Sequence, residues 1–333
     1  MGSNYEKIDF VIPWVDGSDE VWQKKRQQYS PNKGTDVADS RYRDWDVFHY
    51  WFRSVEKFCP WVNHIYLITD RQVPIWLNTD HEKLTVVDHT DYIPEKYLPT
   101  FSSHPIELNM NRIRGLSEKF VYFNDDMFIL RPIKPTVFFK NNLPCDNAIL
   151  SPIIMEADTD IGKVCANNMS IINKYFEKNE VMHSNAAKWF SAKYGKQLLR
   201  TLCLMPWHHI AGFYNNHLPV AYLKSTFDEL WGKEYVLLDE TSQHRYRDCS
   251  RDVNQWLMRY WQLCKGQFEP ISPSRGACFS CADEEAIDAI RKQKYAMICI
   301  NDNESMDEFI RHKKNLHDAL DSILPEKSSF ERG

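Results

Sequence analysis

The sequence lacks a long apolar run, a surplus of basic residues and a regular cysteine framework. No stretch approaches the about 18 consecutive apolar residues of a membrane-spanning helix, and the polar N-terminus has no signal-peptide core. Lys and Arg together number 41, against 46 Asp and Glu. Proteins that mainly bind nucleic acid usually carry a basic footprint, so this balance argues against that class of partner.

Nine cysteines lie scattered along the chain, an odd number without dense spacing. Such usage is typical of a reduced protein, and we expect a cytoplasmic location. Cys278 and Cys281 form a lone C-x-x-C pair. A structural zinc site normally needs four ligands, so we interpret the pair as two ordinary thiols near a turn.

Hydrophobic residues make up 43% of the 333 positions, enough for one large domain or two ordinary ones. The run IDFVIPWV at 8–15 predicts a buried strand, DGSDE predicts a turn, and a helix begins near Val21. Similar strand-like runs end at Asp70, near Asp88 and before Asn124. Strands that alternate with helices favour an α/β fold with a mostly parallel sheet flanked by helices.

Later segments extend this pattern. A late strand is predicted in YAMICINDN, and residues 205–250 are rich in loops. Helices are predicted at 46–58, 106–119, 168–204, 252–264 and 304–324.

Polar side chains follow three of the predicted strands. The run KFVYFNDDMFIL places two carboxylates and an amide between two apolar segments that look destined for a core. If the strands are parallel neighbours, these groups converge on one edge of the sheet, where ligands bind. Clustered oxygen ligands suit Mg²⁺ or Mn²⁺, which we therefore expect as cofactor. The residues concerned are Asp16, Asp19, Asn124, Asp125, Asp126, Asn301 and Asp302.

Four regions of the sequence resemble the Stealth family of sugar-1-phosphate transferases. They are IDFVIPWVDGSD, the long region from RYRDWDVFHYWF to VYFNDDMF, NNHLPVAYLKSTFDELW with HRYRDCSRDVNQ, and CINDN. Together they cover more than half of the chain, and the second is highly specific. The family includes bacterial capsular-polysaccharide phosphotransferases and the catalytic core of the animal lysosomal-enzyme N-acetylglucosamine-1-phosphotransferase.

The resemblance implies a GT-A/Rossmann-like core and one reaction. An acceptor hydroxyl attacks the phosphorus nearest the sugar of a UDP-sugar, UMP leaves and a phosphodiester forms. N-acetylglucosamine is the sugar we expect first. The chain lacks the large inserted modules with which the animal enzyme recognises protein acceptors, so the expected acceptor is a growing capsular or cell-surface glycan. Peripheral association with capsule machinery at the inner face of the cytoplasmic membrane is an alternative location.

The resemblance also implies roles for individual residues. Asp126 and Asp302 match metal-holding positions, and His217 matches the catalytic histidine, our candidate general base. Arg247 matches a phosphate-clamping arginine, whose planar fork can hold two phosphoryl oxygens. Residues expected to contact the donor or line its pocket are Asp9, Asp16, Asp19, Gln72, Ser103, Glu107, Asn124, Asp125 and Asn301, with Arg41, Arg43 and Arg53 as further anion-binding candidates.

We divide the chain into four parts on this basis. Residues 1–155 form the half of the catalytic core that binds the nucleotide sugar, and residues 156–205 form a helical insertion on the acceptor side. Residues 206–303 complete the core. Residues 304–333 form a C-terminal helix and tail.

Two other functions stay open. A conventional retaining glycosyltransferase would use the same donor but release UDP, and a glycan-binding scaffold would carry a decayed site. The intact Asp126, His217, Arg247 and Asp302 argue against the scaffold.

The turn at 16–19 also fits a simple N-cap for the following helix, although the resemblance favours a place at the donor site.

Overall fold

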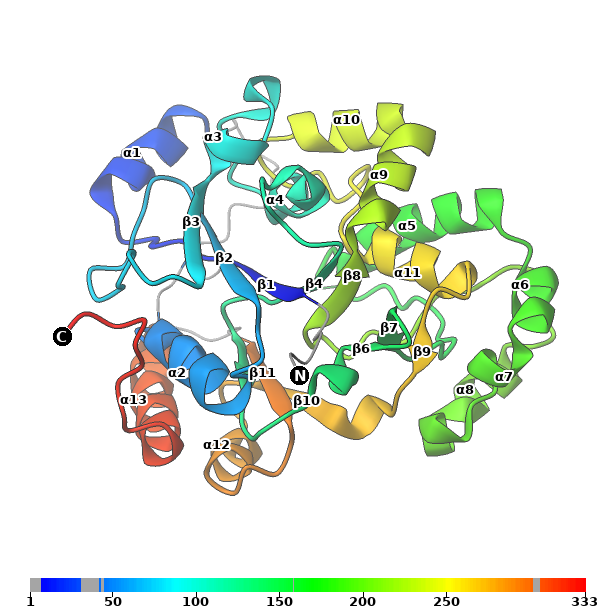
Figure 1. Ribbon diagram of the computed structural model, residues 1–333. Helices are drawn as coiled ribbons and strands as arrows, with labels where there is room; N and C mark the ends of the chain where they lie inside the picture. Colours follow the sequence, from blue (N-terminus) through cyan, green and yellow to red (C-terminus); the bar gives the residue numbers. More distant parts are fainter. Residues whose placement is uncertain (1–6, 31–41, 43–44, 158, 302–305) are drawn as a thin grey trace, which may run out of the picture.

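A five-stranded sheet forms the centre of the molecule (Figure 1), and the computed structural model describes residues 7–30, 42, 45–157, 159–301 and 306–333. The first four strands in the spatial order are parallel, and the last is antiparallel to its neighbour. This confirms the expected α/β fold with a mostly parallel sheet. The order is β3 (Leu84–Asp88), β2 (His64–Thr69), β1 (Ile8–Pro13), β4 (Lys119–Tyr122) and β8 (Val220–Leu223).

Both faces of this sheet are covered, which is why its strands read as nearly unbroken apolar runs. On β1, Phe10 belongs to one core and Val11 to the core on the opposite face. Helices α2 (Phe48–Phe58), α12 (Glu284–Arg291) and α13 (Met306–Ile323) contribute to the first core. Helices α4 (Ser103–Leu108), α5 (Ile161–Tyr175), α9 (Lys224–Lys233) and α11 (Trp256–Cys264) contribute to the second.

Helix α2 packs directly on the central sheet. Its Trp51 is fully buried, and its ring centroid lies 6.4 Å from that of Phe10 on β1. The same indole lies 5.4 Å from the ring of Phe123, just past the end of β4. The helix therefore holds the two central strands together from one face.

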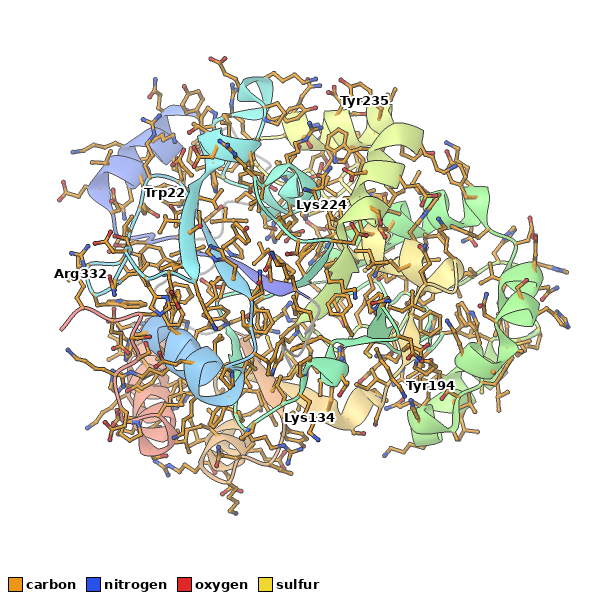
Figure 2. All side chains as sticks on the ribbon, viewed as in Figure 1. Trp22, Lys134, Tyr194, Lys224, Tyr235 and Arg332 are labelled. Atoms are coloured by element: carbon orange, nitrogen blue, oxygen red, sulfur yellow. The ribbon has the colours of Figure 1, made fainter. Side chains whose placement is uncertain are left out.

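The opposite side of α2 binds the C-terminal part of the chain. The Tyr50 hydroxyl donates to Asp321 of α13 at 3.1 Å, and Arg53 donates two hydrogen bonds of 2.8 Å to the carboxylate of Glu331. The expectation of an anion-binding Arg53 is therefore wrong, because its guanidinium already holds a carboxylate. Arg332, labelled in Figure 2, lies in this tail at the edge of the molecule, and its backbone N–H donates to the carbonyl of Trp76 at 2.7 Å.

Two small sheets flank the central one. The first has the order β10 (Gly276–Ser280), β11 (Met297–Asn301) and β5 (Met127–Ile129), and the second has β6 (Phe139–Lys140), β7 (Leu143–Asp146) and β9 (Glu269–Pro270). Strand β11 pairs parallel with β10 and antiparallel with β5. If all the predicted strands were parallel neighbours in one sheet, β11 would lie in the central sheet. It lies in the first of the small sheets instead.

Three predicted segments differ from the structure. The helix expected at 106–119 begins earlier, as α4, ends at Leu108 and is followed by a 3₁₀ turn at Met110–Arg112; Gly115, with φ of +86°, lies past it. Residues 205–250 hold β8, α9 and α10 (Tyr235–Gln243), so they are not mainly loop. The region expected as one helical stretch at 168–204 comprises most of α5, then α6 (Lys178–Ser184), α7 (Ala186–Trp189), a 3₁₀ segment (Ala192–Gln197) and α8 (Leu198–Cys203).

Helices α5 to α8 lie along one side of the molecule (Figure 1). Tyr194, labelled in Figure 2 and fully buried, connects this side to the region after β7. Its hydroxyl donates to the carbonyl of Lys188 at 2.7 Å and accepts from the N–H of Ala148 at 3.1 Å. Throughout the described ranges, every helix is too short or too polar to cross a membrane.

Candidate active site

The polar turn Asn124–Asp126 connects two different sheets. The N–H of Phe123 donates to the carbonyl of Val11 at 2.9 Å, which prolongs the β1–β4 pairing by one residue. The N–H of Met127 then donates to the carbonyl of Asn124 at 3.2 Å, and β5 begins. The two apolar runs in KFVYFNDDMFIL are therefore two strands, and the carboxylates stand where the chain passes from one sheet to the other.

Strand β11 reaches the same turn from the other side. The N–H of Ile300 donates to the backbone carbonyl of Asp126 at 2.9 Å, so Asn301 ends β11 beside the turn. Cys278 of β10 lies directly opposite Cys299 of β11 in the parallel register. The polar turn and Asn301 are thus brought together through a second sheet, whereas Asp16 and Asp19 follow β1 in a separate turn.

His217 enters this cluster from the loop that precedes β8. Its backbone has a φ of +45°, a left-handed conformation that few residues other than glycine adopt. The imidazole Nε2 lies 3.5 Å from Nδ2 of Asn124. The other ring nitrogen, Nδ1, lies 3.5 Å from Sγ of Cys299 and 4.0 Å from Sγ of Cys278. The proposed base and the amide of the polar turn are therefore neighbours.

The remaining contacts of the cluster join its acid to its thiols. The Cys299 thiol donates to Oδ2 of Asp126 at 3.3 Å, and Nδ2 of Asn301 donates to the sulfur of Cys278 at 3.3 Å. The whole cluster comprises Asn124, Asp126, His217, Cys278, Cys299 and Asn301.

Burial and neighbouring charges shift the pKa values of this cluster. Burial raises the pKa of Asp126, although the nearby His217 partly opposes this. Burial alone would lower the pKa of His217, but Cys278 and Asp126 outweigh it and raise the pKa overall. The contact between the two thiols lowers the pKa of Cys278, with help from His217, and raises the pKa of Cys299.

The carboxylate of Asp126 is only partly hydrogen-bonded by the described residues. Its Oδ1 atom is buried and forms no hydrogen bond with the described residues. A buried carboxylate oxygen without a partner is costly unless a cation or a substrate group meets it. Asp126 could therefore hold a divalent cation, with Asn124 and Asn301 in the same cluster. Asp125 is exposed, and Asp302 lies outside the described residues.

Ser103 and Arg247, far apart in sequence, are brought together. Nη2 of Arg247 donates to Oγ of Ser103 at 2.9 Å, at the start of α4. One turn further along α4, the buried Glu107 accepts from the hydroxyl of Tyr122 at 3.3 Å. Tyr122 is the last residue of β4, so α4 carries Ser103 and Glu107 to the same end of the sheet as the polar turn. Arg247 is therefore held at that end of the sheet by a hydrogen bond from Nη2 of its guanidinium to Ser103.

Asp16 and Gln72 also lie together, after β1 and β2. The Gln72 side chain accepts from the N–H of Asp16 at 3.0 Å and donates to its carbonyl at 2.9 Å. The side chain of Asp16 accepts from the N–H of Ser18, and that of Asp19 accepts from the N–H of Trp22 at 2.8 Å. Asp19 is therefore the N-cap of α1 (Glu20–Gln28), the simpler of the two interpretations. Gln72 shapes the loop that carries Asp16.

Asp9 lies at the wrong end of the sheet for the expected nucleotide contact. It is fully buried near the N-terminus of β1, where it accepts from Nδ2 of Asn63 at 2.6 Å and from the N–H of Ser117 at 2.7 Å. Both partners precede neighbouring parallel strands, so Asp9 fastens the opposite edge of the sheet. The assignment of Asp9 to the donor is therefore corrected. Arg41 and Arg43 lie outside the described residues.

Sequence reasoning interpreted Cys278 as an ordinary thiol and missed Cys299. The C-x-x-C spacing drew attention to Cys281, whereas the structure pairs Cys278 with Cys299 across two strands. One sequence feature could have found Cys299: it stands two residues before Asn301, so on a strand both side chains share a face.

Comparison with known proteins finds two matching family models and relatives that cover nearly the whole chain. Residues 6–34 match the model of Stealth protein CR1, conserved region 1, and residues 41–146 match Stealth protein CR2, conserved region 2. The chain is 45% identical, over 99% of both chains, to a capsular polysaccharide phosphotransferase WcwK of Streptococcus pneumoniae. It is 45% identical to the receptor polysaccharide phosphotransferase WefC of Streptococcus gordonii, over 98% of this chain and 99% of the relative. It is 43% identical to the exopolysaccharide phosphotransferase cps2G of Lactiplantibacillus plantarum, over 98% of this chain and 96% of the relative.

Proposed function

Because this chain belongs to the Stealth family and is a phosphotransferase, we propose that it transfers a sugar-1-phosphate from a UDP-sugar to a growing glycan. The sugar is N-acetylglucosamine, and the acceptor is a hydroxyl of a capsular or cell-surface polysaccharide. The hydroxyl oxygen forms a bond to the phosphorus nearest the sugar, and the bond from that phosphorus to the oxygen of UMP breaks. A phosphodiester and UMP are the products.

One observation carries the proposal. The imidazole of His217 lies beside Asn124, at the turn where Asp126 keeps a buried oxygen that no described residue meets. Phosphoryl transfer needs a group that accepts a proton and a positive charge that neutralises the phosphates, and catalysis then depends mainly on positioning. The imidazole of His217 is the proton acceptor in this proposal, and the open oxygen of Asp126 is a place for the positive charge.

Each residue then has a distinct task. His217 accepts the proton of the acceptor hydroxyl as the new bond forms. Arg247 holds phosphoryl oxygens with its planar guanidinium, and Ser103 orients that guanidinium through the 2.9 Å hydrogen bond. Mg²⁺ or Mn²⁺, held by Asp126 and Asp302 with the amides of Asn124 and Asn301, would neutralise charge on the phosphates.

The fold and the thiols support two further parts of the proposal. The polar turn lies at the carboxyl end of a mostly parallel sheet, as the donor site does in a GT-A/Rossmann-like enzyme. The adjacent thiols of Cys278 and Cys299 suit a reducing compartment, which favours the cytoplasm or the inner face of its membrane.

Product analysis tests this function directly. The protein is incubated with UDP-N-acetylglucosamine, a glycan acceptor and Mg²⁺ or Mn²⁺, and the released nucleotide is identified by chromatography. We expect UMP and an acceptor that has gained phosphorus. Release of UDP would show a conventional glycosyltransferase instead, and release of no nucleotide with any donor of a UDP-sugar panel would leave a glycan-binding protein.

A further inference from the structure

Three metal-ligating side chains meet beside the polar turn. Among the described residues, Nδ1 of His217 and the sulfurs of Cys278 and Cys299 form a group whose atoms all lie within 4.8 Å of one another. They come from three separate segments, the loop before β8, strand β10 and strand β11. The site proposed above for Mg²⁺ or Mn²⁺ uses oxygen ligands and leaves both sulfurs without a task.

The spacing of these atoms suits a small tetrahedral ion. Zinc binds imidazole nitrogen at about 2.0–2.1 Å and thiolate sulfur at about 2.3 Å, which puts neighbouring nitrogen and sulfur ligands about 3.5 Å apart in a tetrahedron. Nδ1 of His217 already lies 3.5 Å from the sulfur of Cys299 and 4.0 Å from that of Cys278. A small side-chain adjustment would complete the arrangement.

The backbone holds these ligands in place. Cys278 and Cys299 face each other across a parallel pair in direct register, with Cys299 buried and Cys278 exposed to solvent. An ion could therefore enter from the side of Cys278. Oδ2 of Asp126 lies 3.3 Å from the sulfur of Cys299, so a fourth, oxygen ligand is at hand.

Ligand chemistry selects the ion. Thiolates and imidazole prefer Zn²⁺, whereas Mg²⁺ and Mn²⁺ prefer carboxylate, amide and water oxygens. We propose that His217, Cys278 and Cys299 form a binding site for one Zn²⁺ ion, with Asp126 as the fourth ligand. The Zn²⁺ site shares Asp126 with the site for the hard cation but differs from it in its other donors.

Zinc at this site would switch off the base, a consequence that rests on the proposed function. When a metal ion binds Nδ1 of a neutral imidazole, the ring's proton is on Nε2. Nε2 faces the amide of Asn124, and a turn of that amide would present its oxygen to the Nε2 proton. A histidine in that state has no free lone pair for the proton of an acceptor hydroxyl. Bound Zn²⁺ therefore inhibits phosphotransfer even when Mg²⁺ is abundant.

Cobalt titration tests the site without any activity measurement. The full chain, reduced with a phosphine and freed of metal, is titrated with Co²⁺ and then with Zn²⁺. We expect one equivalent of Co²⁺, a thiolate-to-cobalt charge-transfer band in the near ultraviolet, tetrahedral visible bands, and displacement by Zn²⁺. Cys278→Ser, Cys299→Ser and His217→Ala should each weaken binding by at least the roughly 10–100-fold that loss of an outer-shell partner costs. Cys281→Ser, three residues from Cys278, is the matched control and should bind normally.

Several results would overturn the site. They are a wild-type protein without the charge-transfer band, or Cys278→Ser and Cys299→Ser variants that bind Zn²⁺ as tightly as wild type. The site would also be overturned if the two cysteines form a disulfide as isolated and the protein, once that disulfide is reduced, binds no metal. In a separate assay, undiminished phosphotransfer by protein loaded with one Zn²⁺ would overturn ligation by His217. Absence of all phosphotransfer would instead refute the proposed function, and the cobalt titration would stand unaffected.

Discussion

Two carboxylates, one at each end of strand β1, differ in how completely they are hydrogen-bonded. At the amino end, Asp9 is fully buried and both of its oxygens accept short hydrogen bonds, from Asn63 and Ser117. At the carboxyl end, next to β1, Asp126 keeps one buried oxygen without any partner among the described residues. Hydrogen bonds within the fold therefore satisfy both oxygens of Asp9, whereas one oxygen of Asp126 is left unsatisfied by the described residues.

This difference separates a structural acid from a functional one more reliably than burial or sequence position does. A satisfied carboxylate stabilises the native state, and its partners are part of the fold. An unsatisfied carboxylate costs stability, and a protein keeps it where the missing partner is a ligand. Substitutions at five positions test the contrast and the site around it, beginning with the largest expected effect.

Removing the imidazole at the open end should have the largest effect. His217→Ala should lower turnover by roughly 10²–10⁴-fold, the usual span for general acid–base catalysis, because the imidazole that accepts the proton is gone. Donor binding by calorimetry should stay nearly unchanged, since the base acts on the acceptor. His209→Ala, at an exposed histidine, is the control and should keep full activity. Loss of donor binding in His217→Ala would move this residue from the acceptor to the donor.

The next effect concerns the unsatisfied carboxylate itself. Asp126→Asn should reduce turnover at least about 100-fold, because the site loses the charge that holds a cation against the phosphates. The free energy of unfolding should stay the same or rise, because a buried charge with an unpaired oxygen has gone. Urea unfolding and turnover with and without EDTA measure the two quantities. Wild-type activity that persists in EDTA would remove the metal from the mechanism.

The same change at the closed end should have the reverse pattern. Asp9→Asn replaces one acceptor oxygen by a donor, so an N–H group of Asn63 or Ser117 loses its partner. A buried polar group without a partner costs roughly 1–3 kcal/mol, and we expect that loss in the free energy of unfolding. Specific activity of the folded protein should match wild type. An Asp9→Asn protein that is fully stable but inactive would return Asp9 to the donor site.

The smallest effect is expected at the phosphate clamp. Arg247→Lys keeps the charge but loses the planar fork and its hydrogen bond to Ser103, so donor affinity and turnover should each fall about tenfold. Ser103→Ala should produce a weaker form of the same change, because it removes only the orienting hydroxyl. Comparison of KM and kcat for the pair checks this, and unchanged values in Arg247→Lys would exclude a bidentate contact with phosphate.

The sequence allowed the central part of the fold to be predicted because its pattern is regular. Apolar strands that alternate with helices predict a mostly parallel sheet, although they do not show which strands are neighbours. Asn124 then had to lie at the carboxyl end of the sheet. The close approach of His217 came from a family resemblance, because a histidine in a loop carries no periodic signal.

Other features could not be predicted, for physical reasons. Alternation along a strand shows which side chains share a face, but it does not show which strand lies alongside. The pairing of β11 with β5, and of Cys278 with Cys299, depends on that choice. The turn at Asp19 satisfied the requirements of an N-cap and of a ligand equally well, and only the hydrogen bond to Trp22 distinguishes them.

Helix α2 has a thermodynamic consequence for the whole molecule. Trp51 contacts both central strands from one side of the helix, and Tyr50 and Arg53 bind α13 and the tail from the other. Neither layer can melt without exposing this helix, and exposure of its buried aromatic rings is costly. The central sheet and the C-terminal elements therefore share one cooperative unfolding unit. The protein should show a single heat-capacity peak, and damage to the tail should lower the melting temperature of the distant sheet.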